Sequence, residues 1–136
     1  MQHGHDFSTF QPEYSRAENL IRGRPDLDDT IKRLQAFEKA GADVLYAPGL
    51  RDLETMRTVV QAIGKPLNVV MSAADPGLTA AQMEAVGVKR LSVGGALSRL
   101  ALAAFVKGAR EMKEQGGFTW VRDAMPTADL KAVFGA

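Results

Sequence analysis

The sequence predicts an α/β fold in which parallel strands alternate with helices. Three observations support it. Apolar residues recur at helical spacing in four segments, short apolar runs suited to buried strands follow three of them, and a glycine separates each of these helices from its strand. The glycines are Gly41, Gly64 and Gly87, so the unit repeats every 23 residues. A helix, a glycine and a strand at one period are typical of a βα repeat.

The first unit begins at Asp26, which is expected to cap a helix. Apolar residues at positions 27, 31, 34 and 37 follow at i, i+4, i+7 and i+10, which gives the helix one apolar face. We expect this helix to end at Gly41, because glycine adopts the left-handed conformation without a Cβ clash. A buried strand over residues 43–47 follows.

The second and third units repeat this arrangement. Apolar residues between positions 53 and 63 predict a helix that is closed by Gly64, and residues 67–71 form the next strand. Thr79 is expected to cap a third, shorter helix, and residues 90–94 form the strand that follows it. Strands joined in this way by helices lie parallel in one sheet.

The rest of the chain predicts two further helices, one over about residues 96–115 and a short one over 127–134 with Thr127 as its N-cap. Two architectures suit the repeat: an open doubly wound sheet, or part of a (βα)8 barrel. A complete barrel needs about 200 residues or more, so 136 residues would hold only about half of one. The pattern of elements does not separate the two.

Composition excludes several classes of protein. Lys and Arg number 17 against 16 Asp and Glu, for a net charge of +1, and this balance argues against a nucleic-acid partner. The chain has no cysteine, which excludes disulfides and thiolate metal sites. No run reaches the roughly 18 consecutive apolar residues of a membrane span. These features favour a cytoplasmic protein that binds neither nucleic acid nor membrane.

Three segments carry a resemblance to a known family. They read RAENLIRGRPDLDDTIKRLQAFEKAGADVLYAPGL from Arg16, KPLNVV from Lys65 and VGVKRLSVGGALSRLALAAF from Val86. They resemble the C-terminal half of the isocitrate lyase/phosphoenolpyruvate mutase superfamily, in its carboxyvinyl-carboxyphosphonate phosphorylmutase-like and 2-methylisocitrate lyase-like branch. The resemblance implies that residues 15–136 form the C-terminal half, about strands 5–8, of a (βα)8 TIM-type barrel. Residues 1–14 would be a flexible leader unrelated to the family.

The resemblance implies a Mg²⁺-dependent lyase or mutase that cleaves or forms C–C or P–C bonds in small 2-oxo or enolpyruvate-type carboxylates. In the family, the acidic Mg²⁺ ligands and a gating loop lie in the first half, so we expect no metal ligand in this chain and no activity from it alone. The expected partners are a small carboxylate or phosphonate ligand, and either a missing N-terminal half or further copies of the chain. The alternative is a non-catalytic half-barrel oligomer or small-anion-binding module from a split or degenerate gene.

Five residues are the candidates for substrate binding. Arg16 matches the arginine of strand five that grips a substrate carboxylate in the family, and a planar guanidinium suits a bidentate carboxylate or phosphonate pair. Asn68 lies where the family often places an amide facing the substrate. Ser92, Gly94 and Gly95 end the last strand before a helix, where barrel enzymes bind anions through backbone N–H groups. A tight turn explains the two glycines equally well.

Other positions give weaker predictions. Glu18 lies on the same strand face as Arg16 and is a candidate to position it or a metal-bound water, although an exposed glutamate at the start of a loop is an equally good interpretation. The segment at residues 46–50 lacks the glutamate that some family members carry there, which favours a divergent 2-oxo acid enzyme. His3 and His5 form an H-x-H pair that we assign to the leader rather than to a metal site.

Overall fold

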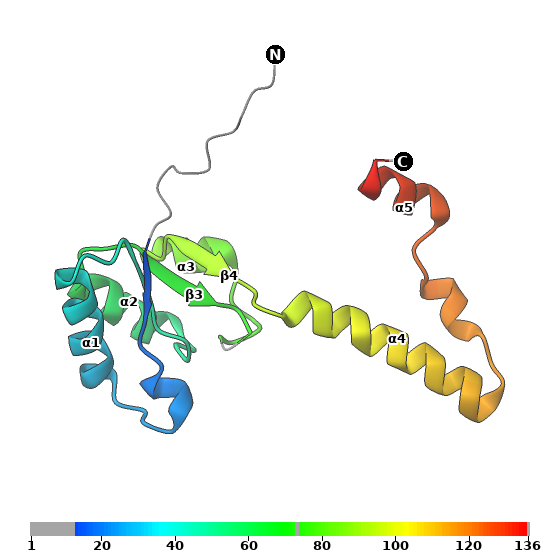
Figure 1. Cartoon of the computed structure of the whole chain (residues 1–136), viewed down its shortest axis with the longest axis horizontal. Coiled ribbons are helices and arrows are strands. Elements are labelled where there is room, and N and C mark those ends of the chain that lie inside the picture. The colour runs from blue at the N-terminus through cyan, green and yellow to red at the C-terminus, as the bar shows by residue number, and fades with distance from the viewer. Residues whose placement is uncertain (1–12, 73, 136) are drawn as a thin grey trace, which may run out of the picture. The chain divides into compact units, whose positions relative to one another are not determined.

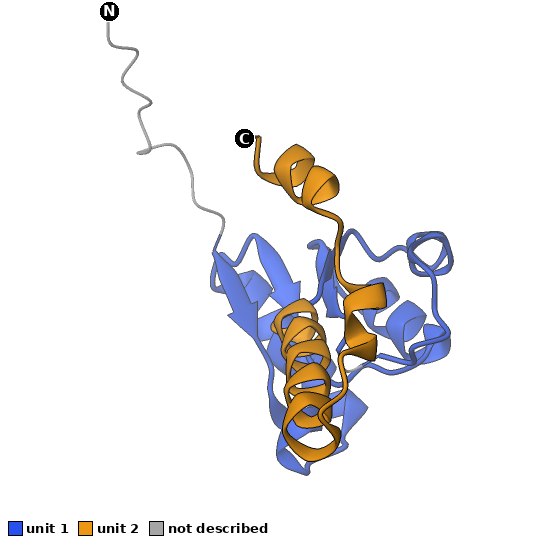
Figure 2. Ribbon diagram, turned by 90° about the vertical axis from the view of Figure 1, so that its right-hand side faces the viewer, with its two compact units in different colours: residues 1–94 blue, residues 95–136 orange. Residues whose placement is uncertain are grey.

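A computed structural model of the chain describes residues 13–72 and 74–135 (Figure 1). The chain divides into two compact units, residues 1–94 and residues 95–136, which are coloured separately in Figure 2. His3, His5 and almost all of the predicted leader lie outside the described residues.

The first unit is built on a parallel sheet, as predicted. Its four strands are β1 (Tyr14–Arg16), β2 (Val44–Tyr46), β3 (Leu67–Val70) and β4 (Arg90–Ser92). They pair in the sequential order β1-β2-β3-β4, and every pair is parallel. A doubly wound sheet reverses its strand order at a switch point, whereas a (βα)8 barrel does not. The observed order therefore favours the barrel architecture.

Helices connect these strands, and side chains fix where the three α-helices begin. The connecting elements are the 3₁₀ helix η1 (Asn19–Arg22) and the helices α1 (Leu27–Lys39), α2 (Leu53–Ala62) and α3 (Ala80–Ala85). Asp26 and Asp52 each accept a hydrogen bond from a backbone N–H of the first turn of α1 and α2. Thr79 and Gln82 form a reciprocal capping box at α3. Each cap satisfies an N–H that the helix leaves unpaired, which typically stabilises the helix by about 1 kcal/mol.

The core of this unit lies between the sheet and the helices that cover one of its faces. Leu45, Leu67 and Val69 alternate along β2 and β3 and are at most 1% exposed. They pack in one cluster with helix residues that include Leu34 and Met56, both fully buried. Burying such a side chain contributes about 1.5–3 kcal/mol, so this cluster holds the helices on the sheet.

A buried polar cluster joins η1 to α1. Asn19 donates from Nδ2 to Thr30 Oγ1 at 2.6 Å and to the Asp26 carbonyl at 3.0 Å. Thr30 Oγ1 in turn donates to the same carbonyl at 2.7 Å. Asn19 and Thr30 are 7% and 0% exposed, so the cluster is shielded from water. It fixes the segment that follows β1.

The three periodic glycines do not all act in the same way. Gly41 and Gly87 have φ of 105° and 96°, as expected for residues that close a helix in the left-handed region. Gly64 is not in that region, because α2 already ends at Ala62 and Ile63 is extended with φ of −125°. The Gly64 N–H instead donates to the Glu38 carboxylate at 3.0 Å. The expectation that Gly64 closes α2 is therefore wrong in its mechanism, although the period itself is real.

The second unit consists of helices α4 (Ala96–Gln115) and α5 (Thr127–Phe134) with the 3₁₀ helix η2 (Thr119–Asp123) between them. The predicted bounds of both α-helices are confirmed. The predicted N-cap of α5 is wrong: Thr127 is already helical, Pro126 occupies the cap position, and no side chain makes a cap hydrogen bond. Proline before the first turn supplies a fixed φ in place of a capping side chain.

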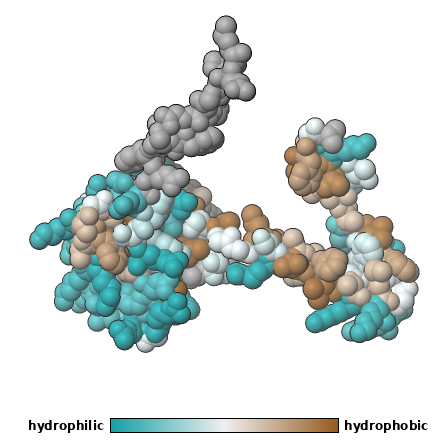
Figure 3. Space-filling model, in the orientation of Figure 1, coloured by the Kyte–Doolittle hydropathy of each residue, from teal (hydrophilic) through white to brown (hydrophobic). Residues whose placement is uncertain are grey.

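Large apolar side chains remain exposed along the helices of this second unit. Figure 3 shows them in brown on the visible face of α4 and α5. Leu100, Phe105 and Phe134 are 67%, 72% and 77% exposed, and Gly108 is the one residue of α4 that is buried. Even so, no described helix combines the length and the apolar character needed to cross a membrane.

Candidate functional site

A polar row crosses the face of the sheet opposite the covering helices. The register pairs Arg16 with Tyr46, Tyr46 with Asn68, and Asn68 with Arg90. Side chains at paired positions point to the same face of a sheet, and their neighbours along each strand point to the other face. Because Leu45 lies on the helix-covered face, the four polar residues occupy the opposite one. In a barrel this face is the interior.

Arg16 ends β1 and is held on two sides. Its Nη2 lies 2.6 Å from Glu18 Oε1, and its guanidinium carbon lies 5.9 Å from the centre of the Tyr46 ring. The Arg16 side chain is 55% exposed. A guanidinium has five N–H donors, so these contacts leave donors available to an anion. Glu18 therefore lies beside Arg16, as the sequence predicted.

Glu18 also contacts a second arginine. Its Oε2 lies 3.0 Å from Arg22 Nη2, one turn further along the chain, and Arg22 Nε donates to the same oxygen at 3.1 Å. Glu18 is therefore shared between two guanidinium groups. Since η1 is joined to α1 by the Asn19 cluster, the segment that carries Glu18 has a fixed support. The local charge remains positive, which suits an anionic ligand.

Asn68 is the centre of a second set of contacts. Its Oδ1 accepts a hydrogen bond from Arg90 Nη1 at 2.7 Å, and its Nδ2 donates to Ser92 Oγ at 3.2 Å. Ser92 Oγ donates in turn to the Val69 carbonyl at 3.4 Å. Asn68 is only 2% exposed, whereas Ser92 is half-buried. Asn68 thus has its amide committed to other residues of the sheet, and Ser92 is the more exposed of the two.

Arg90 was not among the residues that the sequence predicted. Its guanidinium lies 5.0 Å from the centre of the Tyr14 ring, so it reaches from β4 to β1, the two outer strands. Within residues 13–72 and 74–135 no carboxylate forms an ion pair with it. One feature of the sequence could have indicated Arg90: it lies two residues before Ser92 and hence on the same strand face.

Two glycines shape the turns beside this row. Gly94 has φ of +52°, in the left-handed region, yet a Cβ there would meet other atoms only at 3.9 Å or more. The positive φ at this position, rather than a lack of room for a side chain, therefore favours glycine. Gly49, after β2, has φ of 107° and a Cβ there would come within 2.8 Å of the Leu20 Cβ. The remaining predicted residue, Gly95, is the first residue of the second unit.

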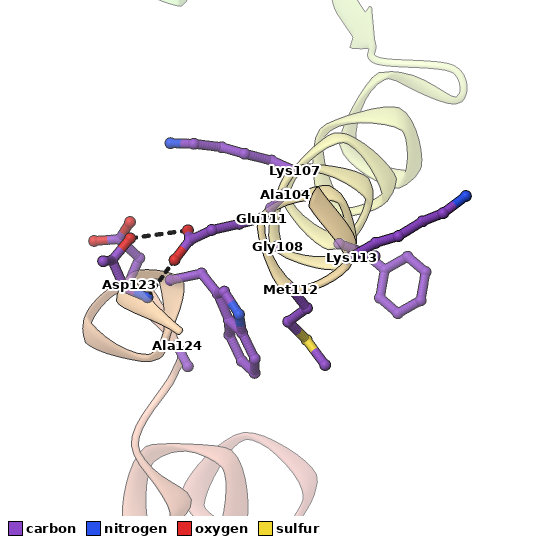
Figure 4. A pocket seen from close by; sticks show the side chains of 12 residues that line it. Ala104, Lys107, Gly108, Glu111, Met112, Lys113, Asp123 and Ala124 are labelled. Atoms are coloured by element: carbon purple, nitrogen blue, oxygen red, sulfur yellow. Dashed lines mark hydrogen bonds between the residues drawn. The ribbon is translucent and has the colours of Figure 1, made fainter. Parts of the chain in front are cut away.

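A cavity of about 770 Å³ lies within the second unit, between α4 and η2 (Figure 4). Trp120 packs beside Gly108, where a Cβ would approach its ring to 3.1 Å. Glu111 accepts hydrogen bonds at 2.6 Å from the Thr119 N–H and at 2.8 Å from its hydroxyl. Both carboxylate oxygens of Glu111 are thus used to hold η2 to α4. The cavity contains none of the residues that the sequence predicted.

The described residues do not form a metal site. No group of three or more His, Cys, Asp or Glu side chains within that part of the chain is arranged to hold a metal ion. Glu18, the carboxylate nearest to Arg16, is shared between two arginines. The donor set of these residues suits an anion rather than a cation such as Mg²⁺, which takes oxygen ligands.

The sequence profile of the family described as phosphoenolpyruvate phosphomutase matches residues 14–113. The chain belongs to this family. The matched residues include all four strands and every residue of the polar row. The resemblance that the three sequence segments carry is confirmed.

Solved structures support the same assignment. A proposed lyase/mutase from Burkholderia cenocepacia is 50% identical, with a TM-score of 0.83 over 90% of this chain and 44% of that one. A 2,3-dimethylmalate lyase of the phosphoenolpyruvate mutase/isocitrate lyase superfamily is 27% identical, with a TM-score of 0.70 over 90% of this chain and 43% of its own. The chain therefore spans less than half the length of the proteins it matches. Its parallel strands form part of a (βα)8 barrel, as predicted.

A third structure shows ligands on a relative. A phosphonopyruvate hydrolase in complex with oxalate and Mg²⁺ is 27% identical, with a TM-score of 0.68 over 90% of this chain and 44% of that one. Oxalate is a small dicarboxylate, which is the class of anion that an exposed guanidinium binds in bidentate fashion.

Proposed function

We propose that this chain supplies the anion-binding part of a lyase or mutase site for small 2-oxo or enolpyruvate-type carboxylates. The observation that carries the proposal is the placement of Arg16. Its guanidinium is more than half exposed at the carboxyl end of β1, and Glu18 and Tyr46 hold it from two sides. Substrates of parallel α/β sheets and barrels bind at the carboxyl ends of the strands.

In this proposal Arg16 binds a carboxylate or phosphonate group through the donors that Glu18 leaves free. The Ser92 hydroxyl and the Gly94 turn lie at the carboxyl end of β4, and Asn68 supports Ser92 from β3. Donors fixed in advance stabilise negative charge that develops on an enolate, because they need no reorganisation during the reaction. Mg²⁺, which the resemblance implies, has no ligand set among the described residues, so the chain's own role is limited to holding the anion.

A second candidate function is non-catalytic binding of a small anion. The lack of a metal-holding cluster among the described residues favours it for this chain taken alone. Mg²⁺-dependent turnover of oxaloacetate and 2-methylisocitrate separates the two functions. Each substrate is tested with the chain alone and with the chain plus the remaining half of the Burkholderia cenocepacia relative. We expect turnover only with the added half. No turnover in either case, with oxalate still bound, would favour the binding function.

We also propose that further copies of the chain cover the apolar residues of the second unit. Phe105 and Leu102 on α4 are 72% and 60% exposed, and helix residues of this size normally pack against a partner. In the first unit, β1 and β4 each leave one edge unpaired within the described residues. Unpaired strand edges favour association with another chain.

Calorimetric titration with oxalate tests the role of Arg16. We expect a dissociation constant on the order of 1 mM, about −4 kcal/mol. The Arg16→Lys substitution should weaken binding about tenfold, because an ammonium group lacks the two parallel donors of a guanidinium. Arg57→Lys is the matched control, since Arg57 is exposed on α2, which packs on the other face of the sheet. Equal effects of the two substitutions would show that Arg16 does not hold the anion.

A further inference from the structure

The contacts of Asn68 fix which way its amide points. Arg90 Nη1 lies 2.7 Å from one end of this amide. A guanidinium only donates hydrogen bonds, so the amide atom that it contacts must be the oxygen. The opposite orientation would place the NH₂ group against the guanidinium, donor against donor. Arg90 therefore determines the orientation of a side chain that is 98% shielded from solvent.

The register shows where the other end of the amide then points. Asn68 is paired with Arg90, whereas Ser92 is paired with Val70, two residues nearer to the carboxyl end of the sheet. With Oδ1 on Arg90, the Asn68 NH₂ group points toward Ser92 and donates to its Oγ at 3.2 Å. Hydrogen bonds thus run in one direction, from Arg90 through Asn68 to Ser92.

This direction decides what the Ser92 hydroxyl offers to a ligand. Its oxygen already accepts from Asn68, and its hydrogen bond to the Val69 carbonyl is long, at 3.4 Å. At that length the bond is weak and exchanges readily for a stronger acceptor. With the amide reversed, Ser92 would donate to Asn68 and present lone pairs outward, which would repel an anion. The orientation seen leaves the hydroxyl free to donate.

We propose that Arg90 is a positioning residue that acts through Asn68 to make Ser92 a hydrogen-bond donor to a carboxylate or phosphonate ligand. The inference rests on the proposed function for the identity of the ligand. It assigns a role to a residue that pairs with no carboxylate within the described residues. The Tyr14 ring, whose centre lies 5.0 Å from the guanidinium carbon, also holds Arg90.

A double-mutant cycle with oxalate as the probe tests this role. We expect Arg90→Met and Ser92→Ala each to raise the oxalate dissociation constant about tenfold. The double variant should be no weaker than Ser92→Ala, because Arg90 acts through the same hydroxyl. Arg90→Lys should restore most of the affinity, since an ammonium group also only donates. Additive losses would show that Arg90 acts simply as a charge and would overturn the proposal.

A measurement without ligand keeps this test separate from the proposed function. In NMR spectra of the free chain, the Asn68 side-chain NH₂ signals should exchange slowly with solvent in the wild type and in Arg90→Lys. In Arg90→Met they should shift and exchange faster, while the backbone spectrum stays dispersed. If oxalate fails to bind the wild type but this result holds, the proposed function fails and the positioning role of Arg90 stands. Unchanged Asn68 signals in Arg90→Met would overturn that role.

Discussion

The two units of the chain use similar apolar residues in opposite ways. In the first unit Leu34, Leu45 and Met56 are fully buried between the sheet and its helices. In the second unit Leu100 and Phe105, of similar size, are more than 60% exposed. The first unit therefore contains its own core, whereas the second unit leaves large apolar side chains of α4 exposed.

The two units also differ in how their helices begin. In the first unit a side chain caps each α-helix, namely Asp26, Asp52 and Thr79. In the second unit the N-cap residues of α4 and α5 are Gly95 and Pro126, and neither helix has a side-chain cap hydrogen bond. Local sequence therefore specifies the helices of the first unit more strongly. The polar row lies in that unit, on a sheet that is held by its own core.

The largest expected effect compares the same substitution in both units. Leu45→Ala should lower the free energy of unfolding by about 2–5 kcal/mol, because it removes buried methyl groups and leaves a cavity. In the unassociated chain, Leu100→Ala should change it by less than about 0.5 kcal/mol, because Leu100 is 67% exposed there. Urea denaturation of the two variants, at a protein concentration low enough to keep the chain monomeric, measures both values. Similar losses would show that Leu100 is buried in solution.

The next prediction concerns association through the second unit. Phe105→Ser should weaken self-association by about 2 kcal/mol, roughly 30-fold, because an aromatic side chain at the centre of an interface contributes that much. Arg110→Ser, an exposed position on the same helix, is the control. Sedimentation over a range of concentrations measures the association constant. A wild-type chain that stays monomeric at micromolar concentration would contradict the proposed partner.

The smallest expected effects on stability come from substitutions at helix N-caps. Asp52 accepts a hydrogen bond from the Thr55 N–H at 2.8 Å, so Asp52→Ala should lower the free energy of unfolding by about 1 kcal/mol. Gly95→Asp should instead stabilise α4 by a few tenths of a kcal/mol, since it supplies a cap where none exists. Thermal unfolding of both variants compares them. A loss of stability in Gly95→Asp would show that the start of α4 requires glycine.

The elements that the sequence predicted well are those that local patterns determine. The apolar period and the Asp26 cap place α1 within two residues of its observed bounds, and the apolar period alone places α4 at its observed bounds. Gly64 was misinterpreted because its role is set by Glu38, which is distant in sequence but close in space. A spacing pattern carries no information on such a contact.

The candidate site was predicted only in part for a similar reason. Arg16 and Asn68 were predicted because they match positions at which the family holds its substrate. Arg90 matches no such position, and although it shares a strand face with Ser92, its contacts with Asn68 and Tyr14 follow from the pairing of the strands. Register depends on how the strands pair, and one strand alone does not reveal it.

The most direct test of the anion site is an oxalate titration followed by NMR of the backbone amides in the wild-type chain. Arg16 ends β1, Ser92 ends β4 and Gly94 follows it, and in a parallel sheet the carboxyl ends of all strands lie along the same edge. The account predicts that the largest shifts fall on residues 16–18 and 92–94 and saturate with one dissociation constant on the order of 1 mM. Shifts confined to the cavity of the second unit, at residues 104–124, or no saturable shifts at all, would contradict it.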